Sequence, residues 1–177
     1  MVKILDLGCG KSKLKGAFGV DFVKFSGVDF AWNLNSSLPK KFNNKFDVVY
    51  HKCVLDHIGN PLDFLENCKN YLKKNGKMVM IIDNGDYWRF HFHFGTYHAD
   101  IWELDEPGHP ETHHKMIFQM KHIIKMLKLI GFKVTNAYYF NDYDKLSFFK
   151  RLRRGHLDYL LPKHIGKNMI FIESVKN

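Results

Sequence analysis

The chain has 177 residues, 45% of them hydrophobic and 25% charged, which fits one domain over residues 1–177 with a core that needs no disulfide or metal staple. No stretch approaches the roughly 18 uninterrupted apolar residues that a membrane span needs, so we expect no transmembrane segment. The formal net charge of +9 is compatible with a polyanionic partner such as RNA or an acidic membrane surface, but net charge alone indicates no binding site.

The cysteines and the first residues bear on the compartment. Cys9, Cys53 and Cys68 are odd in number and include no C-x-x-C pair, which predicts reduced thiols rather than a disulfide framework. The first strand pattern begins at Val2 and leaves no room for a secretory signal. We therefore expect a cytoplasmic protein.

Five strands and one helix are predicted in the first half of the chain. The strands are short apolar runs bounded by turn residues such as glycine and asparagine, at residues 2–7, 19–22, 28–32, 46–50 and 77–82. The first is almost continuously apolar, which is typical of a strand buried on both faces of a parallel sheet. Between the last two lies a helix with Asn60 as its cap, Pro61 in its first turn and Gly76 after its end.

The rest of the chain begins with an irregular segment, residues 83–114, which is long for a connection and is interpreted as a lid or substrate loop. A helix is predicted at 117–130, ended by Gly131, and strands at 132–140 and 169–175. Strands that alternate with helices predict an α/β fold. We expect a Rossmann-like open sheet, mostly parallel with an antiparallel C-terminal strand pair, and helices on both faces.

The loop after the first strand, Gly8 to Gly10, indicates a type of ligand. A dinucleotide fingerprint would need a third glycine where Lys13 stands and a longer helical crossover, and the sequence contains no P-loop motif. Glycines let the backbone approach a ligand closely, and Asp21 supplies a carboxylate that accepts hydrogen bonds from both hydroxyls of a ribose. The combination predicts a ligand that has a ribose but no phosphate, such as an adenosyl compound.

Several segments, in chain order, resemble the class I S-adenosylmethionine-dependent methyltransferases, in particular the methyltransferase type 11 group and a compact subgroup of that pattern. They are "ILDLGCG", "GVDF", "WNLNSSLP", "FDVVYHKCVLDHI" followed by "NPLDFLENCKNYLKKNGKMVMII", and "MKHIIKMLKLIGFKV". The resemblance covers most of the chain. It implies S-adenosylmethionine as the cofactor and S-adenosylhomocysteine as its product.

The resemblance also implies cofactor-binding positions at the ends of the first four strands. These are Asp6, Gly8, Cys9 and Gly10 in the cofactor loop, Asp21 and Phe22 at the ribose, Asn33 and Leu34 at the adenine, and His51 at the methionine end. Asn33 stands where the family more often has aspartate, and its carbonyl oxygen can still accept from the adenine amine. Asp29 also ends an apolar run and is an alternative to Asp21.

Three polar residues follow the fourth strand, where the resemblance places the transferred methyl group: His51, Asp56 and His57. Methyl transfer from a sulfonium is an in-line displacement, so the enzyme aligns the nucleophile and removes a proton from a hydroxyl or amine. A histidine with an ordinary pKa of about 6.5 suits that role. His51 or His57 is the candidate base, and packing of either histidine against a neighbouring loop is the alternative.

Two further features allow other functions. Residues 91–114 have the residue types of a metal site, including His91, His93, Glu111 and the pair His113 and His114, but no specific metal motif. We predict no metal there and interpret the segment as substrate-contacting, with a metal-dependent hydrolase as a third possibility. The basic run at residues 150–154 fits either a solvated helix face or contacts with phosphate groups of RNA or lipid.

The leading prediction is an S-adenosylmethionine-dependent methyltransferase that acts on a hydroxyl or amine of an unidentified acceptor. A small molecule, glycan or lipid is favoured over RNA or protein. After its fourth strand the chain lacks both the [NDS]-P-P-[FYW] tetrapeptide of enzymes that methylate amino groups of nucleic acids and the Pro-Cys of cytosine-carbon enzymes. The alternative is a catalytically silent RNA-binding module with the same fold.

Overall fold

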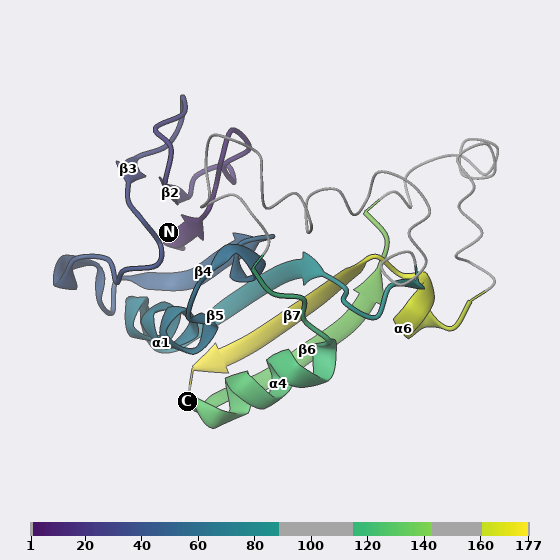
Figure 1. Cartoon of the computed structure of the whole chain (residues 1–177). Helices are drawn as coiled ribbons and strands as arrows, with labels where there is room; N and C mark the ends of the chain where they lie inside the picture. Colours follow the sequence, from purple (N-terminus) through teal and green to yellow (C-terminus); the bar gives the residue numbers. More distant parts are fainter. Residues whose placement is uncertain (1, 89–114, 143–160, 177) are drawn as a thin grey trace.

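The computed structural model describes residues 2–88, 115–142 and 161–176, which form one sheet with helices packed against it (Figure 1). Within this part of the chain the sheet has seven strands, in the order β3-β2-β1-β4-β5-β7-β6. The strands are β1 (Ile4–Leu7), β2 (Phe18–Asp21), β3 (Phe30–Ala31), β4 (Phe46–Lys52), β5 (Leu72–Asp83), β6 (Phe132–Phe140) and β7 (Met169–Lys176). The helices are α1 (Pro61–Tyr71), α4 (Met120–Leu129) and α6 (Lys163–Gly166), with the short 3-10 helices η1 (Lys40–Phe42) and η2 (Leu55–His57).

Strand direction confirms the predicted fold class. The strands β3, β2, β1, β4 and β5 are parallel neighbours, and β7 runs antiparallel between β5 and β6. Leu7 at the end of β1 is in register with Val20 of β2 and with His51 of β4. The carboxyl ends of these strands therefore meet at one edge of the sheet, where ligands bind in folds of this kind.

The bounds of the elements differ from the expected ones at a few places. Helix α1 begins as predicted, because the Asn60 side chain accepts a hydrogen bond from the Asp63 amide at 3.3 Å and donates one to the Asp63 carboxylate at 2.7 Å. Its end differs, since the chain turns extended at Leu72 and enters β5 five residues earlier than predicted. Strand β3 is only two residues long, and β4 extends to Lys52.

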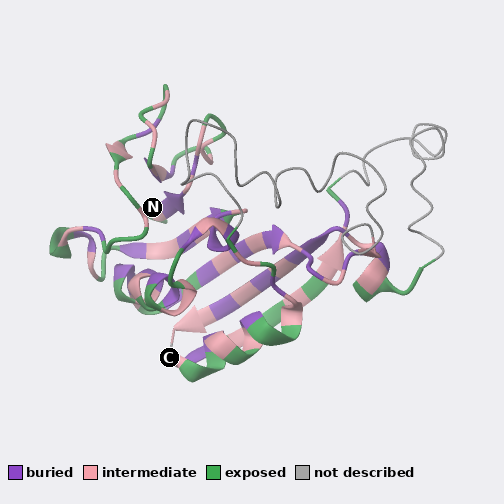
Figure 2. Ribbon diagram, viewed as in Figure 1, coloured by how far each residue is buried: buried purple, intermediate pink, exposed green. Residues whose placement is uncertain are grey.

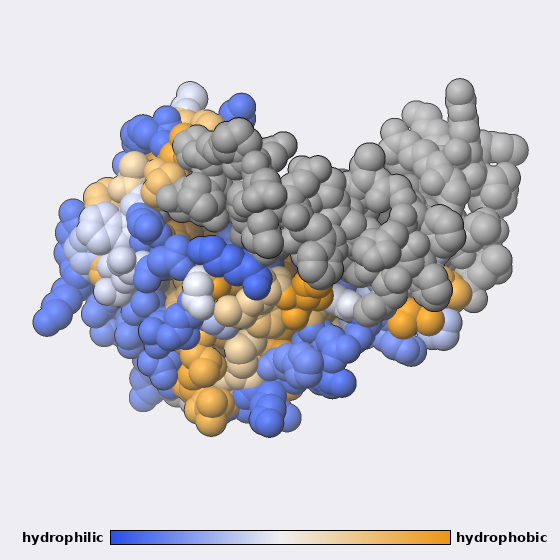
Figure 3. All heavy atoms as spheres, in the orientation of Figure 1, coloured by the Kyte–Doolittle hydropathy of each residue, from blue (hydrophilic) through white to orange (hydrophobic). Residues whose placement is uncertain are grey.

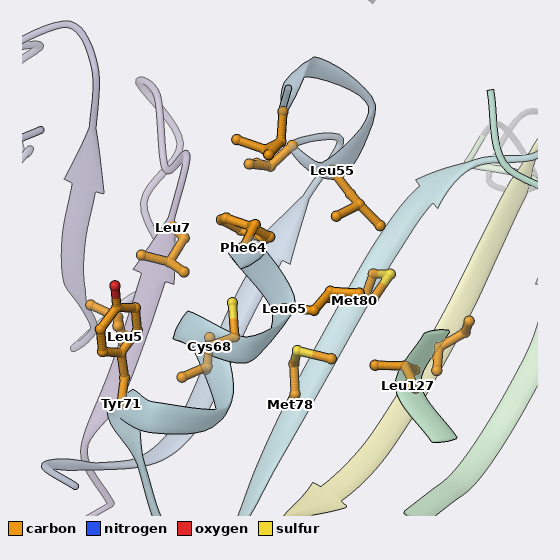
Figure 4. Packing of buried hydrophobic residues seen from close by; sticks show 14 of the residues in the cluster. Leu5, Leu7, Leu55, Phe64, Leu65, Cys68, Tyr71, Met78, Met80 and Leu127 are labelled. Atoms are coloured by element: carbon orange, nitrogen blue, oxygen red, sulfur yellow. The ribbon is translucent and has the colours of Figure 1, made fainter. Parts of the chain in front are cut away.

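The core lies on one face of the sheet, which α1 and α4 both cover (Figures 1 and 4). Leu65 and Cys68 of α1 and Leu127 of α4 are fully buried together with Met78 and Met80 of β5. Successive side chains of a strand point to opposite faces, so over residues 78–83 of β5 and 170–175 of β7 buried residues alternate with partly buried ones (Figure 2).

The other face of the sheet carries half-buried side chains such as Tyr50, Val79, Ile81 and Phe171. The crossovers that would place helices there, residues 8–17 and 22–29, contain only turns and extended backbone. The helices predicted for this second face are therefore not found among the described residues. The physical reason is length, because a helical crossover between parallel strands needs about a dozen residues.

The described surface in the view of Figure 3 is mostly hydrophilic, with smaller hydrophobic patches. Among the residues described, no helix combines the length and the apolar composition needed to cross a membrane.

Candidate functional site

The loop after β1 adopts a conformation that requires glycine. Gly8 has a φ of 68°, and its amide donates a hydrogen bond to the carbonyl oxygen of Val20 at 2.8 Å. A Cβ atom at Gly8 would stand 2.3 Å from Cγ2 of Val54. Gly10 also has a positive φ, 51°, but faces open space. The loop thus packs against the segment after β4, and Gly8 and Gly10 contribute backbone alone to the lining of the adjoining cavities.

Asp21, the last residue of β2, is held in place by this loop. Its Oδ2 atom accepts a hydrogen bond from the Gly10 amide at 2.8 Å, and its Oδ1 atom accepts one from the Val23 amide at 3.0 Å. Each oxygen of a carboxylate has two acceptor positions, so each keeps one for a ligand hydroxyl. The alternative residue, Asp29, accepts from the Gly19 amide and from Lys13, and it is absent from the described lining of both cavities at this edge.

The first of these cavities, the ribose-side cavity, has a volume of about 370 Å³. Apolar side chains of Phe22, Leu34 and Ile58 line it together with the Asp21 carboxylate. Its other lining residues are Gly8, Val23, Phe25, Asn33, Asn35, Cys53, Val54 and His57. An apolar cavity with one oriented carboxylate is suited to a flat heterocycle joined to a sugar.

Asn33 lines this cavity with its carbonyl oxygen already engaged. That oxygen accepts hydrogen bonds from the backbone amide of Asn35 at 2.9 Å and from the Asn35 side chain at 3.2 Å. Asn35 in turn accepts from the Gly59 amide at 2.8 Å, which connects the loop after β3 to the start of α1. The group that Asn33 offers to a ligand is therefore its NH₂, a donor, rather than the carbonyl oxygen expected from the sequence.

The second cavity, the lysine-side cavity, has a volume of about 280 Å³ and adjoins the first. Its charged lining residues are Asp6, Lys11 and Lys52. The others are Gly8, Cys9, Gly10, Ser12, Leu14, Tyr50 and Cys53. Two lysines and an aspartate among the lining residues of one cavity are suited to a ligand that carries both charges.

The acidic groups of the lysine-side cavity have raised pKa values. Asp6 is 2% exposed, and burial raises the pKa of its carboxyl even though Oδ2 accepts a hydrogen bond from the Leu14 amide at 2.8 Å. Burial likewise raises the pKa of the Cys9 thiol to about 11, with the nearby Asp6 adding to the effect. Cys9 is therefore a neutral thiol at neutral pH.

Of the three predicted catalytic residues, His57 reaches the ribose-side cavity. It ends η2, directly after β4, and its Nε2 atom lies 3.7 Å from Oδ2 of Asp56. Asp56 is buried, and its backbone oxygen accepts hydrogen bonds from the amides of Lys115 and Met116. His57 thus lines the cavity, and the buried carboxylate of Asp56 lies next to it outside the described lining.

His51 does not lie with this pair at the cavity. It is fully buried, its ring meets that of Phe64 edge-on with centroids 5.2 Å apart, and it is absent from the described lining of either cavity. Neither ring nitrogen has a hydrogen-bond partner among the described residues, and burial lowers the pKa of His51 to about 4. The structure thus places the residue expected at the methionine end of the cofactor, and as a candidate base, in the core beneath α1.

Sequence reasoning missed several residues that line the cavities, above all Cys53, Tyr50 and Lys52. Tyr50 and Lys52 alternate with Val49 and His51 along β4, so their direction follows once one residue of the strand is assigned to the core. No pattern in the sequence marks Cys53, which follows the strand and has a positive φ of 49°.

The His-rich part of the predicted lid, residues 91–114, lies outside the described residues, and so does the basic run at 150–154. The described residues on either side of this segment are joined to their surroundings by backbone hydrogen bonds. The Gly85 amide donates to the backbone oxygen of Phe118, and the Lys115 amide donates to that of Asp56. Within residues 2–88, 115–142 and 161–176, no three histidine, cysteine or acidic side chains gather in a way that fits a metal ion.

Comparison with known proteins agrees with this geometry. A family model described as a methyltransferase domain matches residues 2–137, well over half of the chain, and the chain therefore belongs to the methyltransferase domain family. No curated protein matches the sequence significantly.

Solved structures with the same fold include three that differ widely in source. An S-adenosylmethionine-dependent methyltransferase from Mesorhizobium loti is 14% identical, with a TM-score of 0.68 over 99% of this chain and 91% of that one. A Thermotoga maritima methyltransferase described as a possible histamine N-methyltransferase is 14% identical, with a TM-score of 0.69 over 100% and 83%. Phosphoethanolamine N-methyltransferase 2 of Haemonchus contortus, in complex with S-adenosyl-L-methionine, is 15% identical, with a TM-score of 0.62 over 99% and 48%.

Proposed function

We propose that this chain is an S-adenosylmethionine-dependent methyltransferase that acts on a hydroxyl or amine of a small molecule, glycan or lipid. The observation that carries the proposal is the Asp21 carboxylate, oriented by two backbone amides at the wall of one cavity and adjoined by a second cavity of mixed charge. The family supports the reaction class, and the Haemonchus contortus neighbour is a protein of this fold that binds the same cofactor.

The ribose-side cavity fits the adenosine part of the cofactor. The two oxygens of Asp21 each have room for one ribose hydroxyl, and Phe22, Leu34 and Ile58 supply apolar contact for the adenine. The NH₂ group of Asn33 is a donor that suits a ring nitrogen of the adenine.

The lysine-side cavity fits the amino-acid part. An α-amino acid carries one ammonium and one carboxylate group, which match the Asp6 carboxylate and the ammonium groups of Lys11 and Lys52. Gly8 lines both cavities. A ligand that spans them therefore passes the backbone of Gly8, which has no side chain to obstruct it.

When bound, S-adenosylmethionine supplies a methyl group on a positively charged sulfur. His57 stands at the cavity wall and is the group we propose to accept the proton from the acceptor hydroxyl or amine. Asp56 is buried, and its Oδ2 atom lies 3.7 Å from the Nε2 atom of that histidine. Residues Lys115 and Met116 hold the backbone at Asp56 from the other side.

The proposal is tested by calorimetric titration of the full chain with S-adenosylhomocysteine. We expect binding, and we expect Asp21→Asn to weaken it by about tenfold to a hundredfold, the range of a hydrogen bond to a charged group. Asp29→Asn is the matched control, because it neutralises a neighbouring carboxylate outside both cavities. Absence of binding by the folded wild-type chain, or equal losses in both variants, contradicts the proposal.

A further inference from the structure

The two cavities adjoin and share two lining residues. Gly8 and Cys53 are the two residues that line both the ribose-side and the lysine-side cavity. Gly8 contributes backbone alone, and the space where a Cβ would be is taken up by Val54. Among the described residues that line both cavities, Cys53 is therefore the one with a side chain that can occupy space where the cavities adjoin.

Cys53 has a backbone conformation that is uncommon for a residue other than glycine. Three residues other than glycine have a positive φ in the described ranges, and the other two, Asn44 and Asn75, belong to the type that adopts this conformation most readily. Cys53 reaches it at the end of β4, where its amide donates a hydrogen bond to the carbonyl oxygen of Ile81 at 2.8 Å. Glycine is the usual residue at such a bend, yet this chain has a thiol at the boundary of the two cavities.

We propose that Cys53 is a specificity-determining residue, whose thiol sets the room available to the atoms that join the two ends of a ligand spanning both cavities. The inference rests on the proposed function, which places adenosine on one side and an amino acid on the other. The sulfur and its neighbouring carbons then lie beside Cys53. A ligand that ends at the ribose stays within the ribose-side cavity and does not pass from one cavity to the other.

The chemistry of the thiol is compatible with this position. Burial raises the pKa of Cys53 well above its usual value, and nearby acidic groups including Asp83 and Asp56 add to the effect. A thiolate beside an electrophilic methyl group would compete with the acceptor as a nucleophile, whereas a neutral thiol is a small polarizable contact. The low acidity of Cys53 thus protects the reaction from self-methylation.

The test compares two ligands on three proteins. Calorimetry measures binding of S-adenosylhomocysteine and of adenosine to the wild-type chain, to Cys53→Met, which lengthens an unbranched side chain, and to Cys53→Ala, which shortens it. We expect Cys53→Met to weaken S-adenosylhomocysteine by about tenfold or more while adenosine stays within about threefold, because overfilling acts only where the longer ligand passes. Cys53→Ala should retain both ligands.

The outcomes separate the inference from the function on which it rests. If the folded wild-type chain binds neither ligand, the proposed function fails. If it binds both and Cys53→Met changes neither, or weakens both equally, the function stands and the role of Cys53 is wrong.

Should Cys53→Met not fold, Cys53→Asn gives the same comparison, because asparagine has a longer side chain than cysteine and adopts a positive φ more readily than most residues. Loss of S-adenosylhomocysteine binding with adenosine retained supports the inference, and any other result overturns it.

Discussion

Gly8 lies so close to Val54 that a Cβ atom added to it would stand 2.3 Å from Cγ2 of that residue. The contact joins the loop after β1 to the segment after β4, the two parts of the chain between which the cavities lie. We expect Gly8→Ala to lower the free energy of unfolding by about 2–5 kcal/mol, from a left-handed backbone that disfavours a side chain and from the overlap itself. Urea unfolding followed by circular dichroism measures this change.

Gly10→Ala is the matched control for that prediction. Gly10 has a similar positive φ but open space where its Cβ would be, so only the backbone cost of about 1–2 kcal/mol is expected. Adding Val54→Ala should restore part of the stability of Gly8→Ala and none of that of Gly10→Ala. Equal losses in the two glycine variants would show that the contact with Val54 contributes nothing.

Burial of His51 makes stability depend on pH. Burial lowers the pKa of this histidine from 6.5 to about 4, so between these values the unfolded chain binds a proton that the folded chain does not. The contribution of neutral His51 is thus fully present above about pH 6.5 and is lost as the pH falls toward 4. We expect a loss of about 2 kcal/mol between pH 7 and pH 5 from this group.

The measurement is urea unfolding of the wild-type chain and of His51→Leu at both pH values. Leucine keeps the core filled and does not titrate, so the variant should lose less stability than the wild type by about 2 kcal/mol. His122→Leu, which changes an exposed histidine on α4, should retain the wild-type dependence. Parallel pH profiles for all three proteins would contradict the assignment of His51 to a dry core.

The fold was predictable because its signals are local and repeated. Hydrophobic runs and the Asn60 cap locate most strands and α1, and the glycines at 8 and 10 occupy positions that indeed need a positive φ. The sequence also showed that the crossover after the first glycine loop is too short for a helix, although helices were expected on both faces of the sheet and none is found in crossovers 8–17 and 22–29.

The finer geometry of the site was less accessible, because it depends on which face of a strand a residue occupies. His51 and Lys52 are adjacent in sequence, yet one is fully buried and the other lines a cavity. The sequence predicts that the side-chain carbonyl oxygen of Asn33 accepts from the adenine amine. In the structure that oxygen accepts a hydrogen bond from the Asn35 amide instead, and no sequence pattern specified this bond. Cys53 takes its importance from two cavities that exist only after folding.

Asp6 combines a stability cost with a proposed role in binding. Burial raises the pKa of its carboxyl, so the ionised form destabilises the folded chain, increasingly as the pH rises from 3.8 through the raised pKa. Asp6→Asn removes the charge and keeps a carbonyl oxygen for the Leu14 amide. We expect the free energy of unfolding at pH 7 to rise and S-adenosylhomocysteine binding to weaken.

Chemical unfolding at pH 7 and pH 3.5, together with calorimetry, checks both parts. The gain in stability should disappear at the lower pH, where the wild-type carboxyl is already protonated. Asp47→Asn is a suitable control, because that carboxylate lies at the far end of β4 and its pKa is lowered, by hydrogen bonds from the Lys3 amide and Lys73. If Asp6→Asn gains stability and binds S-adenosylhomocysteine as tightly as the wild type, Asp6 does not contribute to binding.

His57 provides the sharpest test of the proposed chemistry. A library of amines and alcohols is first screened for compounds that cause release of S-adenosylhomocysteine from S-adenosylmethionine, which identifies an acceptor. His57→Asn is then compared with the wild type on that acceptor. Loss of a general base should lower kcat by about a hundredfold to ten-thousandfold and leave the affinity for S-adenosylhomocysteine within a few fold, since asparagine keeps a polar group at the cavity wall. His122→Asn, on the exposed side of α4, should change neither quantity. If His57→Asn turns over normally across the pH range, alignment of the acceptor alone accounts for catalysis and the histidine is a wall of the cavity.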